Sequence, residues 1–229
     1  MVDIFNTIDK TQIAELPKVE YTGSVRIIDT VEKADAAIAD LLLCNVVGFD
    51  TETRPSFKRG TTNKVSLLQL STDSVSYLFR LHIIGLTDSI ISFLENDKVL
   101  KIGISIRDDF QALRRRRELS PAGFVDLQDM VARMGIDDRS LQKIYALLFG
   151  ERISKTQRLS NWEAEELSES QTHYAAIDAW AVLKIYNYLK KLIDEKNFKV
   201  IHKNAEESIA KAVQIPFLIG CQMVLAKLS

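Results

Sequence analysis

Cysteine is nearly absent from this sequence: 229 residues include only Cys44 and Cys221. The two lie far apart and in no metal-ligand spacing, which excludes a disulfide-rich scaffold and a cysteine-based zinc site. This cysteine usage is typical of a reducing compartment, so we expect a cytoplasmic protein. A chain of this length buries a core large enough to fold without disulfides or a structural metal.

Long apolar runs are also missing. No apolar stretch reaches the ~20 residues that a membrane span requires. The first residues lack the basic start and apolar core of a secretion signal. We therefore expect no membrane partner.

Histidine clusters and glycine-rich turns are lacking too. The three histidines have no ligand spacing, which excludes a zinc-dependent deaminase. Gly103 follows an apolar run, but no second glycine follows it closely, so the G-x-G-x-x-G turn of a dinucleotide-binding protein is absent and we expect no nucleotide cofactor. The 30 basic and 31 acidic side chains nearly cancel, so net charge neither suggests nor excludes a nucleic-acid partner.

The apolar pattern that is present predicts one α/β domain. Alternating or short apolar runs predict strands at 24–28, 46–53, 64–71, 75–81, 99–104 and around 125. Helical periodicity predicts helices at 31–43, 87–95, 105–117, 127–134, 140–149 and 168–194. A meander followed by β-α-β units implies a mixed sheet of five to six strands with helices on both faces. We expect residues 1–24 to form a peripheral arm, residues 25–194 the domain, and residues 195–229 a tail of undetermined role, with a possible helix at 205–213.

Two carboxylates one residue apart end the strand predicted at 46–53. Side chains alternate along a strand, so Asp50 and Glu52 point to the same side and lie close together. Like charges at that distance repel each other unless one is protonated or a cation lies between them. Mg²⁺ and Mn²⁺ prefer carboxylate oxygens and would serve, although two solvated acids at a strand end are the simpler alternative.

Further acids occur at two places where a sheet edge or a buried helix is expected. Ser105 and Asp108 have the spacing of a capping box, which leaves Asp109 free to point elsewhere at the edge of the sheet. Tyr174 and Asp178 are four residues apart and share one face of an otherwise apolar helix. Stabilisation by the helix dipole is the alternative for the first pair, and a structural Tyr–Asp contact for the second.

A family resemblance joins these acids. Three motifs lie in order along the chain: Phe49-Asp50-Thr51-Glu52-Thr53, then Gly103 with Asp109 and Leu113, then Tyr174 with Asp178. Residues 63–70 and 159–162 match as well. With these motifs, residues 25–191 resemble the tyrosine branch of the DEDD 3′–5′ exonuclease superfamily, similar to ribonuclease D and the Werner-syndrome exonuclease.

The resemblance implies a ribonuclease-H-like fold and hydrolysis from the free 3′ end of DNA or RNA, with release of nucleoside 5′-monophosphates. It implies two divalent ions, Mg²⁺ or Mn²⁺, held by Asp50, Glu52, Asp109 and Asp178. Tyr174 would orient the attacking water, since a phenol with a pKa near 10 is a poor base.

Nucleic-acid contacts are expected from the segments that flank these motifs: Thr51, Arg54, Phe57, Lys64, Lys155 and Arg158. The basic run 114–117 covers the whole circumference of a helix end, where cations suit the helix dipole, so we give it a structural role. A module of the same fold that binds nucleic acid without cutting it is the alternative function. DNA and RNA, and every oligomeric state, stay open.

Overall fold

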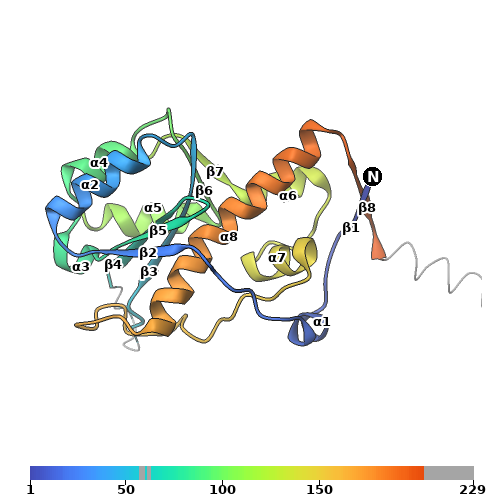
Figure 1. The fold of residues 1–229 in the computed structure, drawn as a ribbon, viewed down its shortest axis with the longest axis horizontal. Coiled ribbons are helices and arrows are strands. Elements are labelled where there is room, and N and C mark those ends of the chain that lie inside the picture. Colours follow the sequence, from blue (N-terminus) through green and yellow to red (C-terminus); the bar gives the residue numbers. More distant parts are fainter. Residues whose placement is uncertain (57–59, 61–62, 204–229) are drawn as a thin grey trace, which may run out of the picture.

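The computed structural model describes residues 1–56, 60 and 63–203, and a six-stranded sheet runs through them (Figure 1). The strand order is β2-β5-β4-β3-β6-β7. The strands are β2 (Ser24–Ile28), β3 (Val46–Thr53), β4 (Val65–Ser71), β5 (Val75–Phe79), β6 (Leu100–Gly103) and β7 (Phe124–Asp126). β4 is antiparallel to both of its neighbours, and the other pairs are parallel, so the sheet is mixed as predicted.

Helices cover both faces of this sheet, because successive side chains of the strands point to opposite faces and both faces are apolar. Phe49 of β3, Leu70 of β4 and Tyr77 of β5 pack on one face with helices α2 (Val31–Leu41), α4 (Asp88–Leu94) and α5 (Ile106–Arg114). The short helix α3 (Leu81–Ile84) follows β5. Helix α8 (Glu169–Asp194) crosses the other face, beside α6 (Leu127–Met134) and α7 (Leu141–Phe149) (Figure 1). The predicted α/β class is confirmed.

Helix α8 approaches the sheet closely at one glycine. A Cβ atom added to Gly48 of β3 would lie 1.8 Å from the backbone oxygen of Ala179. Ala175, Ala176 and Ala179 of α8 are all fully buried. Small residues on both elements therefore set the distance between helix and sheet. Despite its 26 residues, neither α8 nor any other helix in the described part of the chain is both long and apolar enough to cross a membrane.

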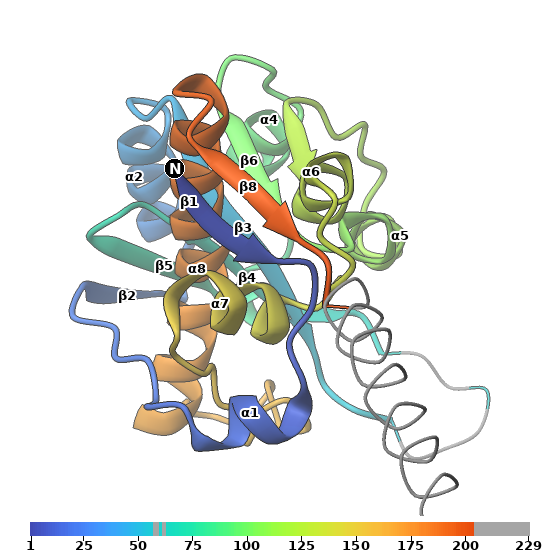
Figure 2. The same cartoon turned by 90° about the vertical axis from the view of Figure 1, so that its right-hand side faces the viewer.

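The N-terminal segment, expected to be a peripheral arm, contributes to the fold. Strand β1 (Val2–Phe5) pairs in parallel with β8 (Phe198–Ile201), and helix α1 (Lys10–Glu15) follows β1 (Figure 2). Ile4 and Ile13 are buried, and Val19 and Tyr21 join the core beneath α8. A four-residue strand whose partner comes from the far end of the chain leaves no local pattern. The helix predicted at 205–213 lies outside the described residues.

Side-chain caps start α2 and α8, whereas α5 starts without the capping box predicted for it. The Thr30 hydroxyl accepts the Lys33 N–H, and Ser168 forms a capping box with Gln171. The capping box predicted for Ser105 and Asp108 is wrong: Ser105 has a left-handed backbone (φ 59°) and makes no side-chain cap. The carboxylate of Asp126 on the neighbouring strand accepts the N–H groups of Ser105 and the following residue instead. A tertiary contact thus replaces the local one.

Candidate active site

Three carboxylates converge where β3 meets α8. The ligand oxygens of Asp50, Glu52 and Asp178 all lie within 4.8 Å of one another. Asp50 and Glu52 share the side of β3 that faces α8, because side chains alternate along the strand. The close contact at Gly48 brings the helix, and with it Asp178, over these two acids. Residues 128 positions apart in the sequence therefore form one acidic cluster.

This acidic cluster resists ionisation. Burial, followed by repulsion from Asp178, Asp109 and Glu52, raises the pKa of Asp50 well above its ordinary value. Burial and the charge of Asp178 raise the pKa of Glu52 to about 9, and burial raises that of Asp178 to about 7. Hard divalent cations relieve this repulsion and prefer oxygen donors, so the cluster fits a divalent metal site.

Asp109 of α5 adjoins the cluster without being one of the three converging carboxylates. The Thr51 hydroxyl donates a hydrogen bond of 2.5 Å to its Oδ1 atom. Burial raises the pKa of Asp109 to about 7. Asp109 lies near enough to Asp50 and Glu52 to raise the pKa of both. Thr51, predicted to contact nucleic acid, thus orients the fourth acid through its side chain.

Tyr174 lies one helical turn before Asp178 on α8 and lines the same pocket. Burial and the charges of Asp178 and Glu52 raise the pKa of the phenol above its ordinary value. The hydroxyl therefore stays protonated near neutral pH. It can donate a hydrogen bond and orient a water molecule, and it does not act there as a base.

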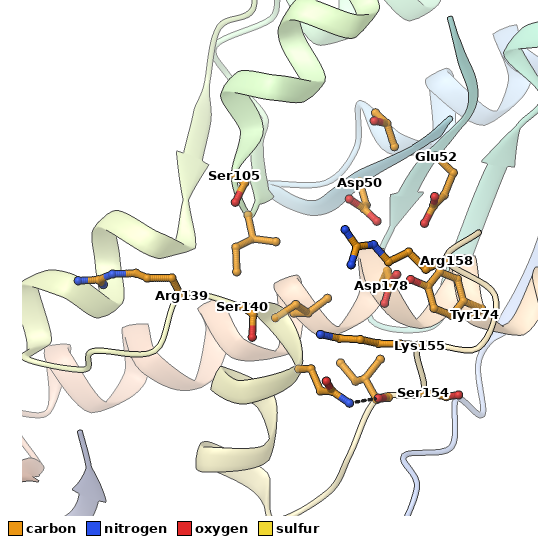
Figure 3. Close-up of a pocket in the computed structure, with 15 residues that line it drawn as sticks. Asp50, Glu52, Ser105, Arg139, Ser140, Ser154, Lys155, Arg158, Tyr174 and Asp178 are labelled. Carbon is orange, nitrogen blue, oxygen red and sulfur yellow. Dashed lines mark hydrogen bonds between the residues drawn. The ribbon is translucent and has the colours of Figure 1, made fainter. Parts of the chain in front are cut away.

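A pocket of about 410 Å³ opens over these side chains, and acids and cations line it together (Figure 3). Lys155 and Arg158 extend into it from the segment between α7 and α8 (Figure 3). Burial raises the pKa of Glu52 and of Asp178. The positive charge of Arg158 partly lowers the pKa of Glu52, and that of Lys155 partly lowers the pKa of Asp178. The pocket thus combines metal-binding donors with groups that attract phosphate.

Arg54 and Lys64, also predicted to contact nucleic acid, do not line this pocket. Arg54 forms an ion pair of 3.3 Å with Glu163, which also accepts the Ser66 hydroxyl. Lys64 is exposed and does not line the pocket. Phe57 lies outside the described residues.

The basic run at the end of α5 mainly binds its own chain. Arg114, Arg116 and Arg117 donate to the backbone oxygens of Leu119, Val65 and Leu86. Arg117 also pairs with Asp88 at 2.7 Å. These contacts agree with the structural role predicted for the run.

The sequence analysis missed the wall that the start of α7 contributes. Arg139 and Ser140 line the pocket together with Ser105. The Gln128 side chain donates to Ser105 Oγ at 2.7 Å and to the Arg139 oxygen at 2.9 Å, which ties the starts of α5 and α7 together. The serine was recognisable as a helix cap, but no local signal places α7 opposite β3.

The raised pKa values predict an unusual pH dependence of stability. Between an ordinary carboxyl pKa near 4 and the folded values of about 7 to 9, the folded state binds more protons than the unfolded state. In EDTA, the melting temperature should therefore fall as pH rises from about 5 to 9. Because metal binding displaces these protons, Mn²⁺ should reverse the fall. Thermal denaturation with and without Mn²⁺ measures both effects, and a melting temperature that rises with pH in EDTA would contradict them.

Comparisons with known proteins agree with this geometry. The model of a 3′–5′ exonuclease family matches residues 25–194. The chain is 32% identical over 206 residues to the bifunctional 3′–5′ exonuclease/ATP-dependent helicase WRN of Mus musculus, covering 85% of this chain and 14% of that protein. It is 33% identical over 177 residues to a 3′–5′ exonuclease of Arabidopsis thaliana, covering 74% of this chain and 59% of the relative. The chain thus spans less than two thirds of either relative.

Solved structures share the fold. The Nibbler EXO domain of Aedes aegypti superposes with a TM-score of 0.68 at 23% identity, covering 81% of this chain and 95% of that one. Ribonuclease D of Escherichia coli gives 0.65 at 21% identity, covering 72% and 44%. A complex of Trypanosoma brucei ribonuclease D with RNA gives 0.63 at 26% identity, covering 73% and 63%. The first two confirm the ribonuclease-H-like α/β fold class.

Proposed function

The chain belongs to the 3′–5′ exonuclease family, and on that premise we propose that residues 25–194 remove nucleotides from the 3′ end of DNA or RNA and release nucleoside 5′-monophosphates. The observation that carries the proposal is the convergence of Asp50, Glu52 and Asp178 within 4.8 Å beneath a pocket lined by Lys155 and Arg158. A metal site alone requires only the acids. The basic side chains of Lys155 and Arg158 in the same pocket are what a phosphate-containing substrate would bind.

The acids provide the ligands for two divalent ions, Mg²⁺ or Mn²⁺. Asp50, Glu52 and Asp178 would hold one, and Asp50 together with Asp109 the other. When bound, such a pair stabilises the charge on the attacking and leaving oxygens of an in-line displacement at phosphorus. The Thr51 hydroxyl orients Asp109 for this task.

Tyr174 and Glu52 act on the substrate side of the reaction. The protonated phenol of Tyr174 donates a hydrogen bond and so orients the attacking water, which is the role expected in the tyrosine branch. Glu52 accepts the terminal 3′-hydroxyl, which selects a free 3′ end. The proton of the attacking water leaves to solvent, and the leaving 3′-oxygen of the shortened strand takes a proton in exchange.

Lys155 and Arg158 are proposed to bind the phosphates that flank the scissile bond. Their place in the same pocket as the acids, together with the RNA in the complex of the related Trypanosoma brucei ribonuclease D, supports nucleic acid as the ligand. Both side chains come from the segment that precedes α8, the helix that carries Tyr174.

Removing the basic side chain of Lys155 or Arg158 should weaken substrate binding more than it lowers the turnover rate. We expect Lys155→Ala and Arg158→Ala to raise KM by roughly tenfold each and to lower the salt dependence of binding by about one phosphate contact. Steady-state kinetics and salt titrations of oligonucleotide binding measure the two quantities. Lys64→Ala is the matched control, because this exposed lysine lies outside the pocket lining. Equal effects of all three substitutions would contradict the assignment.

Digestion of end-labelled substrates tests the proposed activity directly. Single-stranded DNA, duplex DNA and RNA labelled at the 5′ end should give ladders that shorten from the 3′ end with Mg²⁺ or Mn²⁺ and none with EDTA. Tyr174→Phe should lower the rate by roughly 100-fold with little change in KM, because it removes an oriented hydrogen bond. Retained binding without cleavage in either metal would favour the alternative of a binding module.

A further inference from the structure

Gln69 of β4 carries a buried polar group that the fold leaves unused. Its side chain is 0% exposed. Neither its Oε1 nor its Nε2 atom has a hydrogen-bond partner among residues 1–56, 60 and 63–203. Buried amides are normally hydrogen-bonded, and an unpaired one lowers the stability of the fold. An apolar side chain of the same length would be expected at this position unless the amide has a task.

The register of the sheet places this amide beside the acidic cluster. Gln69 is the direct cross-strand partner of Asp50 in the antiparallel pair of β3 and β4. Directly opposite residues point to the same face, with Cβ atoms about 4.5–5.5 Å apart, so the longer glutamine side chain can reach the carboxylate. On its other side Gln69 faces Leu78 of β5, which offers the amide no polar side chain.

The two neighbouring positions on this face of β4 differ from Gln69. Leu67, opposite Glu52, is apolar. Ser71, opposite Gly48, is satisfied, because its hydroxyl lies 2.8 Å from that of Ser76 and donates to the Thr72 oxygen. The unpaired amide therefore occurs at the position opposite Asp50 and at neither of its neighbours.

We propose that Gln69 is a positioning residue for the metal site: its amide N–H donates to the Asp50 carboxylate oxygen when that carboxylate binds a divalent cation. This inference rests on the proposed function. An ionised carboxylate only accepts hydrogen bonds and keeps free lone pairs after one oxygen has bound a cation. Such second-layer donors orient a metal-binding carboxylate, and their loss typically weakens metal binding 10- to 100-fold.

The test separates this role from a structural one by measuring metal affinity and stability in the same variants. Gln69→Met keeps the length of the side chain and removes the amide. In the full chain stripped of metal, we expect it to keep or raise the melting temperature in EDTA, because two unpaired polar atoms disappear. Its Mn²⁺ affinity, measured by calorimetric titration without substrate, should fall at least tenfold.

Ser71→Ala is the matched control on the same face of the same strand. It should lower the melting temperature and leave Mn²⁺ affinity unchanged, because its hydrogen bonds do not involve the acids. An unchanged Mn²⁺ affinity in Gln69→Met would overturn the inference. A weaker affinity accompanied by a melting temperature as low as that of Ser71→Ala would also overturn it, since the amide would then be structural.

Asp50→Asn distinguishes failure of this inference from failure of the proposed function. If Asp50→Asn loses Mn²⁺ affinity and Gln69→Met does not, only the role of Gln69 is wrong. If Asp50→Asn keeps Mn²⁺ affinity, the proposed metal site itself is wrong.

Discussion

Replacing Asp50 by Asn should lower exonuclease activity at least a thousandfold and, in EDTA, raise the melting temperature. The amide keeps the shape of the side chain but removes the carboxylate proposed to bind both ions, so most of the stabilisation of the transition state is lost. The same change removes a carboxyl group whose ionised form burial and the charges of Asp178, Asp109 and Glu52 disfavour in the folded state, whereas the unfolded state ionises it freely above its ordinary pKa. The rate at which nucleotides are removed from a 3′ end measures the first effect, and thermal denaturation measures the second.

The opposite signs of these effects distinguish a functional acid from a structural one. A carboxylate that held the fold together would cost stability when replaced. Asp108→Asn is the matched control, because this exposed aspartate adjoins Asp109 on α5 and does not line the pocket over the acids. It should change neither activity nor melting temperature appreciably. An Asp50→Asn enzyme that retains a tenth of the activity would refute the proposed role.

Gly48→Ala should destabilise the protein strongly and reduce activity together. The added Cβ atom would lie 1.8 Å from the Ala179 oxygen and 2.8 Å from its carbonyl carbon. Both are backbone atoms, so α8 has to move away from β3. We expect a loss of roughly 3 kcal/mol or more in the free energy of unfolding, at the upper end for overpacked sites. Because α8 carries Asp178 and Tyr174, a shift of about 1 Å should also lower the rate of the surviving folded enzyme by about 100-fold.

Gly85→Ala separates this collision from ordinary glycine strain. Gly85 has a φ of 69°, and nothing lies within 4 Å of an added Cβ atom. Its ψ of −167° adds a backbone conformation that is essentially restricted to glycine, so its replacement should cost about 1–3 kcal/mol through the backbone alone and leave turnover unchanged. Urea denaturation and steady-state rates, measured on both variants, decide the matter. Equal losses of turnover in the two variants would show that the contact between α8 and β3 does not position the acids.

The sequence by itself determined what depends on local repetition. The alternation of β3 put Asp50 and Glu52 on one side, and helical periodicity put Tyr174 and Asp178 on one face of α8. Helical periodicity also predicted helix starts at 31 and 168, and the structure begins α2 at Val31 and α8 at Glu169. These features follow from periods of two and 3.6 residues, which any reader of the chain can count.

Tertiary structure alone decided which distant groups meet. It set Asp109 against Thr51, placed Asp126 at the start of α5, and closed the N-terminal segment onto β8. It also left the Gln69 amide beside Asp50 without a hydrogen-bond partner among the described residues. Each of these contacts joins residues from different elements, and their geometry depends on how those elements pack rather than on the pattern within either one. The residue types of the site were therefore readable from the sequence, and its shape was not.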